Sequence, residues 1–212
     1  MAEIAKGDLM PQPALHINRT KTVIPTPIEG ISEITTDTDV FYRSNNGFLF
    51  LGEIYSPEGN SLTAPVIEKI MTKRLSLLPL NKAIKIGSGP IDIIEISDPS
   101  CQHCRNLHAY LSSRKDVTRH IFFSVVSGSF GEYFAKRIIL NPSEMDSVYS
   151  GKLDRSHIHS LNIDPDLLLP HKSAAFAVGA KGVPSLFLNG QYVLGTDIPK
   201  IDSIFQRIEK ES

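Results

Sequence analysis

Residues 91–104 read Ile-Asp-Ile-Ile-Glu-Ile-Ser-Asp-Pro-Ser-Cys-Gln-His-Cys, and this stretch decides the fold. Its first six residues are nearly continuous apolar, β-branched sequence, which is typical of a central strand buried on both faces. Residues 98–100 then supply capping oxygens and a helix-starting proline. After them, Cys104, Leu107, His108 and Leu111 fall on one helical face. The sequence therefore places a CxxC pair where a buried strand meets a helix.

The two cysteines of this pair are the only ones among 212 residues, so they cannot form a disulfide scaffold and indicate chemistry instead. A cysteine in the first helical turn gains thiolate character from the exposed backbone N–H groups and the helix dipole. We therefore expect Cys101 to be the nucleophile. Cys104 follows one turn later and deeper in the domain, where it can resolve a mixed disulfide. An imidazolium at His103 would favour the Cys101 thiolate further and make the disulfide more oxidising.

Two other interpretations of a CxxC pair are half of a zinc site and a structural disulfide. Zinc would need two more ligands, and the nearby candidates, His103 and His108, are poorly arranged for it. His157 and His159 alternate in a polar segment that we expect to face solvent. The strand–CxxC–helix context favours redox chemistry, and we expect no metal and no cofactor.

A second signal is the run Gly-Val-Pro-Ser-Leu-Phe-Leu at residues 182–188, because a proline that enters a strand after a glycine loop often marks a tight or cis peptide. Together with the CxxC segment it resembles the thioredoxin superfamily. There a cis-proline loop faces the CxxC sulfurs, and the backbone of the preceding residue pairs with an extended substrate chain. The resemblance implies that Val183 and Pro184 bind substrate.

Glu95 lies six residues before the first cysteine, which is the spacing at which thioredoxins and DsbA-type oxidases carry a buried acid. By that resemblance Glu95 would shuttle protons for the second cysteine. The alternative is an acid at a strand edge that stays in water. Arg105 and Lys115 also lie near the pair, but charged residues on the outer face of a helix mostly face solvent, so we leave them out of the site.

The N-terminal half has a different pattern from the CxxC half. Residues 40–43 and 48–51 read as two strands joined by an Asn-Gly step that favours a type I′ turn, and residues 65–78 have helical spacing until Pro79 stops it. The remaining expectations are a loosely structured start with a short strand at 22–24, a strand at 117–126, several helices within 131–178, a hairpin at 185–188 and 192–194, and a closing helix at 198–208.

From about residue 22 to the C-terminus, this order resembles the DsbC/DsbG family of bacterial periplasmic disulfide isomerases. The resemblance implies an α+β chain with a thioredoxin-fold catalytic domain at 82–212 that carries a helical insertion at about 131–178. A small antiparallel-sheet, cystatin-like dimerisation domain at 1–64 and a linker helix at 65–81 would precede it. It also implies a V-shaped homodimer whose apolar cleft holds misfolded or reduced client proteins, and a DsbD-like membrane thiol reductase as electron donor.

Composition excludes several other classes of function. The net charge is −1 and the basic residues are scattered, which disfavours nucleic-acid binding. No apolar run approaches the ~20 residues needed to span a bilayer, so we expect no membrane insertion. The first residues lack the apolar stretch of a signal peptide, so we expect either a cytosolic protein or one whose signal has been removed. The family resemblance favours the periplasm.

Two departures from that family leave the activity open. Val183 replaces the usual threonine before the cis-proline, and the Gln102-His103 dipeptide looks more like that of a DsbA-type oxidase. A second, structural disulfide is also missing. We therefore keep three hypotheses: a disulfide isomerase, a dithiol oxidase that donates the Cys101–Cys104 disulfide, and a chaperone-like binder of unfolded chains.

Overall fold

The structure is a computed structural model that describes residues 21–152 and 164–211, so His157 and His159 lie outside the described residues. The chain divides into two compact units, residues 1–70 and 71–212. In the described part of the chain, no helix is both long enough and apolar enough to cross a membrane.

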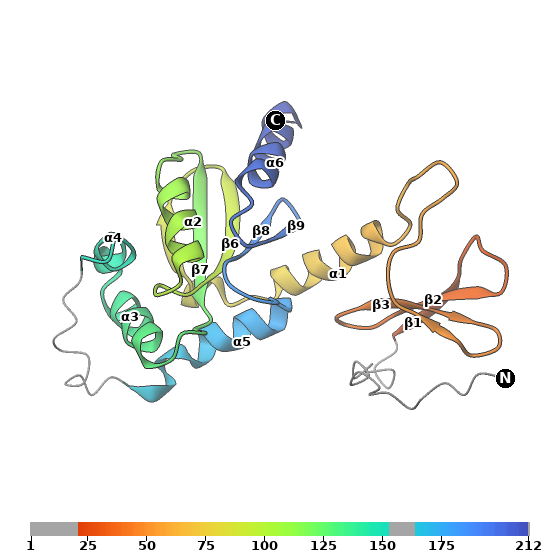
Figure 1. Cartoon of the computed structure of the whole chain (residues 1–212), viewed down its shortest axis with the longest axis horizontal. Helices are drawn as coiled ribbons and strands as arrows, with labels where there is room; N and C mark the ends of the chain where they lie inside the picture. Colours follow the sequence, from red (N-terminus) through yellow and green to blue (C-terminus); the bar gives the residue numbers. More distant parts are fainter. Residues whose placement is uncertain (1–20, 153–163, 212) are drawn as a thin grey trace, which may run out of the picture. The chain divides into compact units, whose positions relative to one another are not determined.

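The first unit is a four-stranded antiparallel sheet with the strand order β1-β2-β3-β4 (Figure 1). Its strands are β1 (Thr22–Pro25), β2 (Ile31–Thr35), β3 (Val40–Ser44) and β4 (Leu49–Phe50). Ile34, Phe41 and Tyr42 form its buried core. The Tyr42 hydroxyl bonds to the Thr63 hydroxyl at 2.5 Å, which ties the end of the sheet unit to the start of the following helix.

The turn between β3 and β4 differs from the predicted type I′ turn. Ser44 N donates to Phe48 O at 3.0 Å and Gly47 N donates to Ser44 O at 2.9 Å. Within this turn only Gly47 has a positive φ, of 91°, whereas type I′ needs two such residues. The connection is a type I turn followed by a glycine bulge. The reason is the register: Arg43 pairs with Leu49 and Ser44 bonds to Phe48, so three residues, 45–47, close the loop rather than two.

Helix α1 (Ala64–Ser76) follows the first sheet, which confirms the predicted helix before Pro79, although it ends two residues before the predicted residue 78. From Met71 onward the helix belongs to the second unit, and Met71 and Leu75 pack against a buried cluster of that unit. A short 3₁₀ turn, Leu80–Lys82, connects it to the next strand.

The second unit is built on a five-stranded sheet with the order β5-β7-β6-β8-β9. The strands are β5 (Ile84–Gly87), β6 (Ile91–Ser97), β7 (Val117–Phe123), β8 (Ser185–Leu188) and β9 (Gln191–Leu194). The central strand β6 is parallel to β7 and antiparallel to β8. The sequence patterns did not predict β5. The β8–β9 hairpin is confirmed, and its turn has positive φ at both Asn189 and Gly190.

Helices cover both faces of this sheet (Figure 1). Alternation along β6 puts Ile93 and Glu95 on one face and Ile94 and Ile96 on the other. The Ile93 face packs against α2 (Gln102–Ser112) and α6 (Ile198–Glu211), and further along against α3 (Ser129–Leu140) and α4 (Met145–Tyr149). The Ile96 face packs against α5 (Leu169–Val178) and the end of α1. The predicted α+β class, a small antiparallel sheet followed by a helix-covered mixed sheet, is confirmed.

Candidate active site

Cys101 occupies the N-cap position of α2, directly after strand β6 and a short loop. Its backbone N–H donates to Asp98 O at 3.0 Å, and its carbonyl accepts from Arg105 N at 3.0 Å, as the first bond of the helix. The side chain is partly exposed. We expected residues 98–100 to supply the capping group, and this is wrong: Cys101 occupies the N-cap position, and its side chain makes no capping hydrogen bond. The thiol is thus the side chain closest to the positive end of α2.

Asp98 instead links two loops through hydrogen bonds. Its buried carboxylate accepts from Ser100 N at 2.9 Å and Ser100 Oγ at 2.6 Å, and from Val126 N at 2.9 Å and Ser127 N at 3.2 Å. Burial acts to raise the Asp98 pKa, but these hydrogen bonds outweigh it, and the pKa lies below its ordinary value. The loop before Cys101 is therefore fixed to the loop after β7.

Arg105 also holds this loop, contrary to the expectation that it only faces solvent. Its Nε donates to Pro99 O at 3.0 Å, and its side chain is partly buried. Gly131 on α3 packs against the other side of the loop, where a Cβ would lie 2.8 Å from both Asp98 Oδ1 and Ser100 Oγ. The backbone that presents Cys101 is therefore constrained from two sides.

The Val183–Pro184 peptide is cis, and it lies opposite the first cysteine. Cys101 Sγ is 4.0 Å from the Val183 carbonyl oxygen, although the two residues are 82 positions apart. Gly195 N donates to the Pro184 carbonyl at 2.8 Å, which anchors the start of β8 to the end of β9. The fold thus brings together the two motifs that the sequence analysis selected separately.

Cys104 lies behind Cys101 with no exposed surface. Its sulfur accepts from Asp98 N at 3.3 Å. Burial raises the pKa of the Cys104 thiol strongly, and the nearby charges of Cys101 and Glu95 raise it further. Hydrogen bonds from Asp98 and Ser97 act in the opposite direction but are outweighed. Cys104 is therefore a thiol that needs a proton acceptor before it can react.

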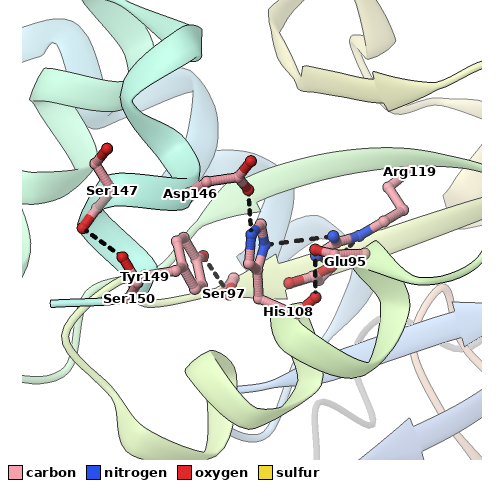
Figure 2. Close-up of polar contacts among 9 residues, drawn as sticks. Glu95, Ser97, His108, Arg119, Asp146, Ser147, Tyr149 and Ser150 are labelled. Atoms are coloured by element: carbon pink, nitrogen blue, oxygen red, sulfur yellow. Dashed lines mark hydrogen bonds and ion pairs between the residues drawn. The ribbon is translucent and has the colours of Figure 1, made fainter. Parts of the chain in front are cut away.

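Glu95 is fully buried on the same sheet face as this thiol, so the alternative of an acid in water is wrong. Its Oε2 accepts from Arg119 Nη2 at 2.6 Å and Arg119 Nε at 3.1 Å (Figure 2). Its Oε1 has no hydrogen-bond partner among the described residues. One carboxylate oxygen is thus neutralised by a guanidinium, and the other is left as a buried acceptor.

Three residues near this carboxylate could not be selected from the sequence: Arg119 on β7, and Asp146 and Tyr149 on α4 of the insertion. His108, considered above as an inner helix position and as a poorly placed zinc candidate, lies between Arg119 and Asp146 (Figure 2). Tyr149 donates to or accepts from the Ser97 hydroxyl at 2.8 Å, and its ring stacks on His108. The one available signal was an arginine inside β7, a strand whose seven residues are all buried.

His103 is exposed on α2, and its backbone carbonyl accepts from Thr196 Oγ1 at 2.9 Å. Gln102 is exposed as well, and its side chain donates to Asn106 Oδ1 along the helix at 2.9 Å. The CxxC dipeptide therefore faces outward. Within residues 21–152 and 164–211, no group of three or more His, Cys, Asp and Glu side chains is arranged to hold a metal ion.

Comparison with known proteins agrees with both units. Residues 10–64 match the family model of the disulfide bond isomerase protein N-terminal domain, DsbC_N. No curated protein matches the chain. Among solved structures, a disulfide interchange protein from Neisseria gonorrhoeae is 22% identical, with a TM-score of 0.50 over 61% of this chain and 97% of that one.

Two further structures have the same fold. The thiol-disulfide exchange protein α-DsbA2 from Wolbachia pipientis is 12% identical, with a TM-score of 0.52 over 69% of this chain and 98% of that one. A linker-deletion mutant of Proteus mirabilis ScsC is 16% identical, with a TM-score of 0.53 over 70% and 87%. At these identities the likeness shows the thioredoxin fold, and the N-terminal family model adds the DsbC-type sheet domain. The chain therefore combines a thioredoxin-fold unit with an N-terminal domain that matches the DsbC_N family model.

Proposed function

We propose that this protein is a dimeric disulfide isomerase in which Cys101 is the nucleophile and Cys104 the resolving thiol. The observation that carries the proposal is the 4.0 Å approach of Cys101 Sγ to the Val183 carbonyl beside the cis peptide. The first sulfur is accessible at a helix N-terminus, and the second is buried behind it. This division between an attacking and a resolving sulfur is what thiol-disulfide exchange requires.

The reaction begins when the Cys101 thiolate attacks one sulfur of a wrong disulfide in a client protein. A bond forms between Cys101 and the client, and the other client sulfur leaves as a thiolate. A different client thiolate can then attack the mixed disulfide, which releases Cys101 and leaves a rearranged client. Alternatively Cys104 attacks Cys101, which closes the Cys101–Cys104 disulfide and leaves the client reduced.

Val183 and Pro184 would bind the client chain during this exchange. An extended segment that pairs with the Val183 backbone would lie within reach of the Cys101 sulfur, because that sulfur already contacts the Val183 carbonyl. Val126, Phe130 and Leu194 are 67%, 45% and 50% exposed on neighbouring segments. Exposed apolar side chains of this kind suit the unfolded segments of a misfolded client.

Glu95 would accept the Cys104 proton when that thiol resolves the mixed disulfide. The thiol is buried, and Glu95 Oε1, which has no hydrogen-bond partner in the part of the chain that the structure describes, is a buried acceptor near it. The outward-facing His103 would assist at the other sulfur, because it follows Cys101 by two residues at the start of α2.

Residues 1–64 would form the dimerisation domain. In β1 the adjacent residues Val23 and Ile24 are each 49% exposed. Because successive side chains of a strand point to opposite faces, β1 has exposed apolar side chains on both faces. Phe48, Phe50 and Leu51 at the other edge are 66%, 48% and 59% exposed. Open edges with apolar side chains are the kind of surface that a second copy would cover.

By family resemblance, the protein would act in the periplasm and receive electrons from a DsbD-like membrane thiol reductase. A reduced Cys101 is needed to attack a disulfide, so an isomerase depends on such a donor.

A dithiol oxidase is the second candidate. The Gln102-His103 dipeptide and Val183, where the isomerases usually have threonine, favour it. In this case the Cys101–Cys104 disulfide passes to a reduced client, and the protein is oxidised at rest.

The two candidates can be separated with ribonuclease as the client in a glutathione buffer. An isomerase restores activity to scrambled ribonuclease, whereas an oxidase speeds disulfide formation in reduced ribonuclease without reshuffling it. We expect the full chain to reactivate the scrambled client and the Cys101→Ser variant to lose that activity. Rapid oxidation without reactivation would favour the oxidase. Client aggregation suppressed equally by wild type and a Cys101→Ser/Cys104→Ser variant, with no reactivation, would favour a chaperone-like binder.

A further inference from the structure

A chain of hydrogen bonds leads from the buried Glu95 to the protein surface (Figure 2). Arg119 holds Glu95 with Nε and Nη2, and its Nη1 lies 3.3 Å from His108 Nδ1. On the other side of the ring, His108 Nε2 lies 2.9 Å from Asp146 Oδ1. His108 is buried, whereas the Asp146 side chain is 89% exposed. These hydrogen bonds therefore link α2, β6 and β7 to α4 of the insertion.

The hydrogen-bond donors around His108 determine which ring nitrogen carries the proton. Arginine has only donor groups, so His108 Nδ1 must be the acceptor of the Arg119 hydrogen bond. The proton of the neutral ring then lies on Nε2, which donates to Asp146. A proton on Nδ1 would point at the guanidinium and break the contact. In agreement, burial and the Arg119 charge lower the pKa of His108, and Asp146 and Glu95 oppose that effect without cancelling it.

A short helix of the insertion holds this histidine in two ways. Asp146 bonds to Nε2, and Tyr149 on the same helix stacks on the ring with a centroid distance of 4.2 Å. Tyr149 also bonds to Ser97, which contributes a hydrogen bond to the Cys104 thiol. The charged and titratable groups that face His108 are thus Asp146 and Tyr149 from α4, Arg119 from β7 and Glu95 from β6.

We propose that His108 and Asp146 are positioning residues that hold Arg119 on one oxygen of Glu95, so that helix α4 controls how readily Cys104 reacts. This inference rests on the proposed function, in which Cys104 resolves mixed disulfides. With His108 in place, all three kinds of Arg119 N–H group have acceptors, and Glu95 Oε1 stays free of partners among the described residues. Without it, a buried Nη1 group loses its acceptor, and the guanidinium gains by turning towards Oε1. The proton acceptor for Cys104 would then be occupied.

The same sheet provides a matched control for this pair. His120 on β7 and Asp92 on β6 form a second histidine–aspartate contact, with Nε2 3.0 Å from Oδ1 and an aspartate side chain that is 73% exposed. His120 lies one residue after Arg119 and therefore on the opposite sheet face, and its Nδ1 has no partner within the described residues. An Asp92→Asn change alters the same kind of surface contact without touching Arg119.

The test follows the two sulfurs separately in the full chain. Reduced protein is mixed with 5,5′-dithiobis(2-nitrobenzoate) in a stopped-flow instrument. In the first phase the Cys101 thiolate attacks the reagent, forms a mixed disulfide and releases one thionitrobenzoate. In the second phase Cys104 loses its proton and attacks Cys101, which forms the Cys101–Cys104 disulfide and releases the second thionitrobenzoate. The rate of the second phase against pH is the readout.

We expect His108→Leu and Asp146→Ala to slow the second phase by about tenfold, the effect of one hydrogen bond to a charged group. Its pH profile should move to higher pH, and the first phase should stay unchanged. His108→Gln can accept from Arg119 and donate to Asp146, so it should restore most of the rate. Asp92→Asn should match wild type in both phases.

A second phase and pH profile in Asp146→Ala that match those of Asp92→Asn would overturn the inference, even if His108→Leu fails to fold, because the Asp146 side chain is exposed. Failure of the proposed function gives a different result. In that case wild type itself would show no second phase, or none that depends on Cys104.

Discussion

Arg119 and Glu95 form an ion pair that is closed off from solvent: Nη2 lies 2.6 Å from Oε2, and the side chains are 1% and 0% exposed. Burying two charges is costly, and a buried pair contributes to stability only while both members are present. In this fold the pair lies beside the resolving thiol, and Glu95 helps to raise the pKa of that thiol. The stability of the sheet and the chemistry of Cys104 are thus coupled through one side chain.

This coupling predicts a strongly non-additive double-mutant cycle. Arg119→Met should lower the free energy of unfolding by about 3–5 kcal/mol, because it leaves a buried carboxylate without its partner. Adding Glu95→Gln should recover much of that loss, since the remaining carboxamide carries no charge. Urea unfolding of the two single variants and the double variant measures the interaction. Additive losses in the double variant would show that the pair does not act as a unit.

The buried His171 should make the free energy of unfolding depend on pH in the acid range. Its Nδ1 accepts from Phe123 N at 3.2 Å, and burial lowers its pKa to about 4. The folded pKa lies below the unfolded value of about 6.5, so between these values the unfolded chain binds a proton that the folded chain does not. Stability should fall as the pH drops from about 6.5 to about 4, by at most about 3 kcal/mol from this residue.

Urea unfolding of wild type and a His171→Gln variant across this pH range checks the effect. The glutamine can still accept from Phe123 N but does not titrate, so its unfolding free energy should depend less on pH. His108 also has a lowered pKa and leaves part of the slope in place. Equal slopes in the two proteins would rule out His171 as the source.

The exposed strand β1 gives a prediction about assembly. Ile24→Lys places a charge on a strand edge that we propose a second copy covers, so the variant should sediment as a monomer at concentrations where wild type is a dimer. Leu140→Lys on α3 is the matched control, because Leu140 is 63% exposed in the other unit. A wild type that is monomeric throughout, or an Ile24→Lys variant that stays dimeric, would contradict the proposed role of this edge.

Local patterns in the sequence predicted much of the fold. The buried strand, the CxxC helix with its inner face of Cys104, Leu107, His108 and Leu111, and the β8–β9 hairpin all follow from short-range periodicity and turn residues. Strand β5 escaped prediction because it is only four residues long and becomes a strand by pairing with β7. The β3–β4 turn was assigned the wrong type because its register depends on pairing rather than on the Asn-Gly step.

The site residues also fall into two groups, those that the sequence indicates and those that only the packing brings together. Cys101, Cys104, Val183, Pro184 and Glu95 could be selected by spacing and resemblance. Arg119 and Asp146 could not, because they meet Glu95 and His108 across 24 and 38 residues of sequence and only the packing of α4 on the sheet brings them together. The burial of Glu95 also depended on that packing.

The central claim is that Cys101, beside Val183, is the sulfur that attacks client disulfides, and trapping the intermediate tests it most directly. A Cys104→Ser variant cannot resolve the mixed disulfide, so after incubation with scrambled ribonuclease and an acid quench it should carry the client on Cys101, as identified by mass spectrometry of the linked peptides. The Cys101→Ser variant should trap almost none, because Cys104 is buried and its pKa is raised. If Cys104→Ser traps no client, or if Cys101→Ser traps as much of it through Cys104, the assignment of the two sulfurs is wrong.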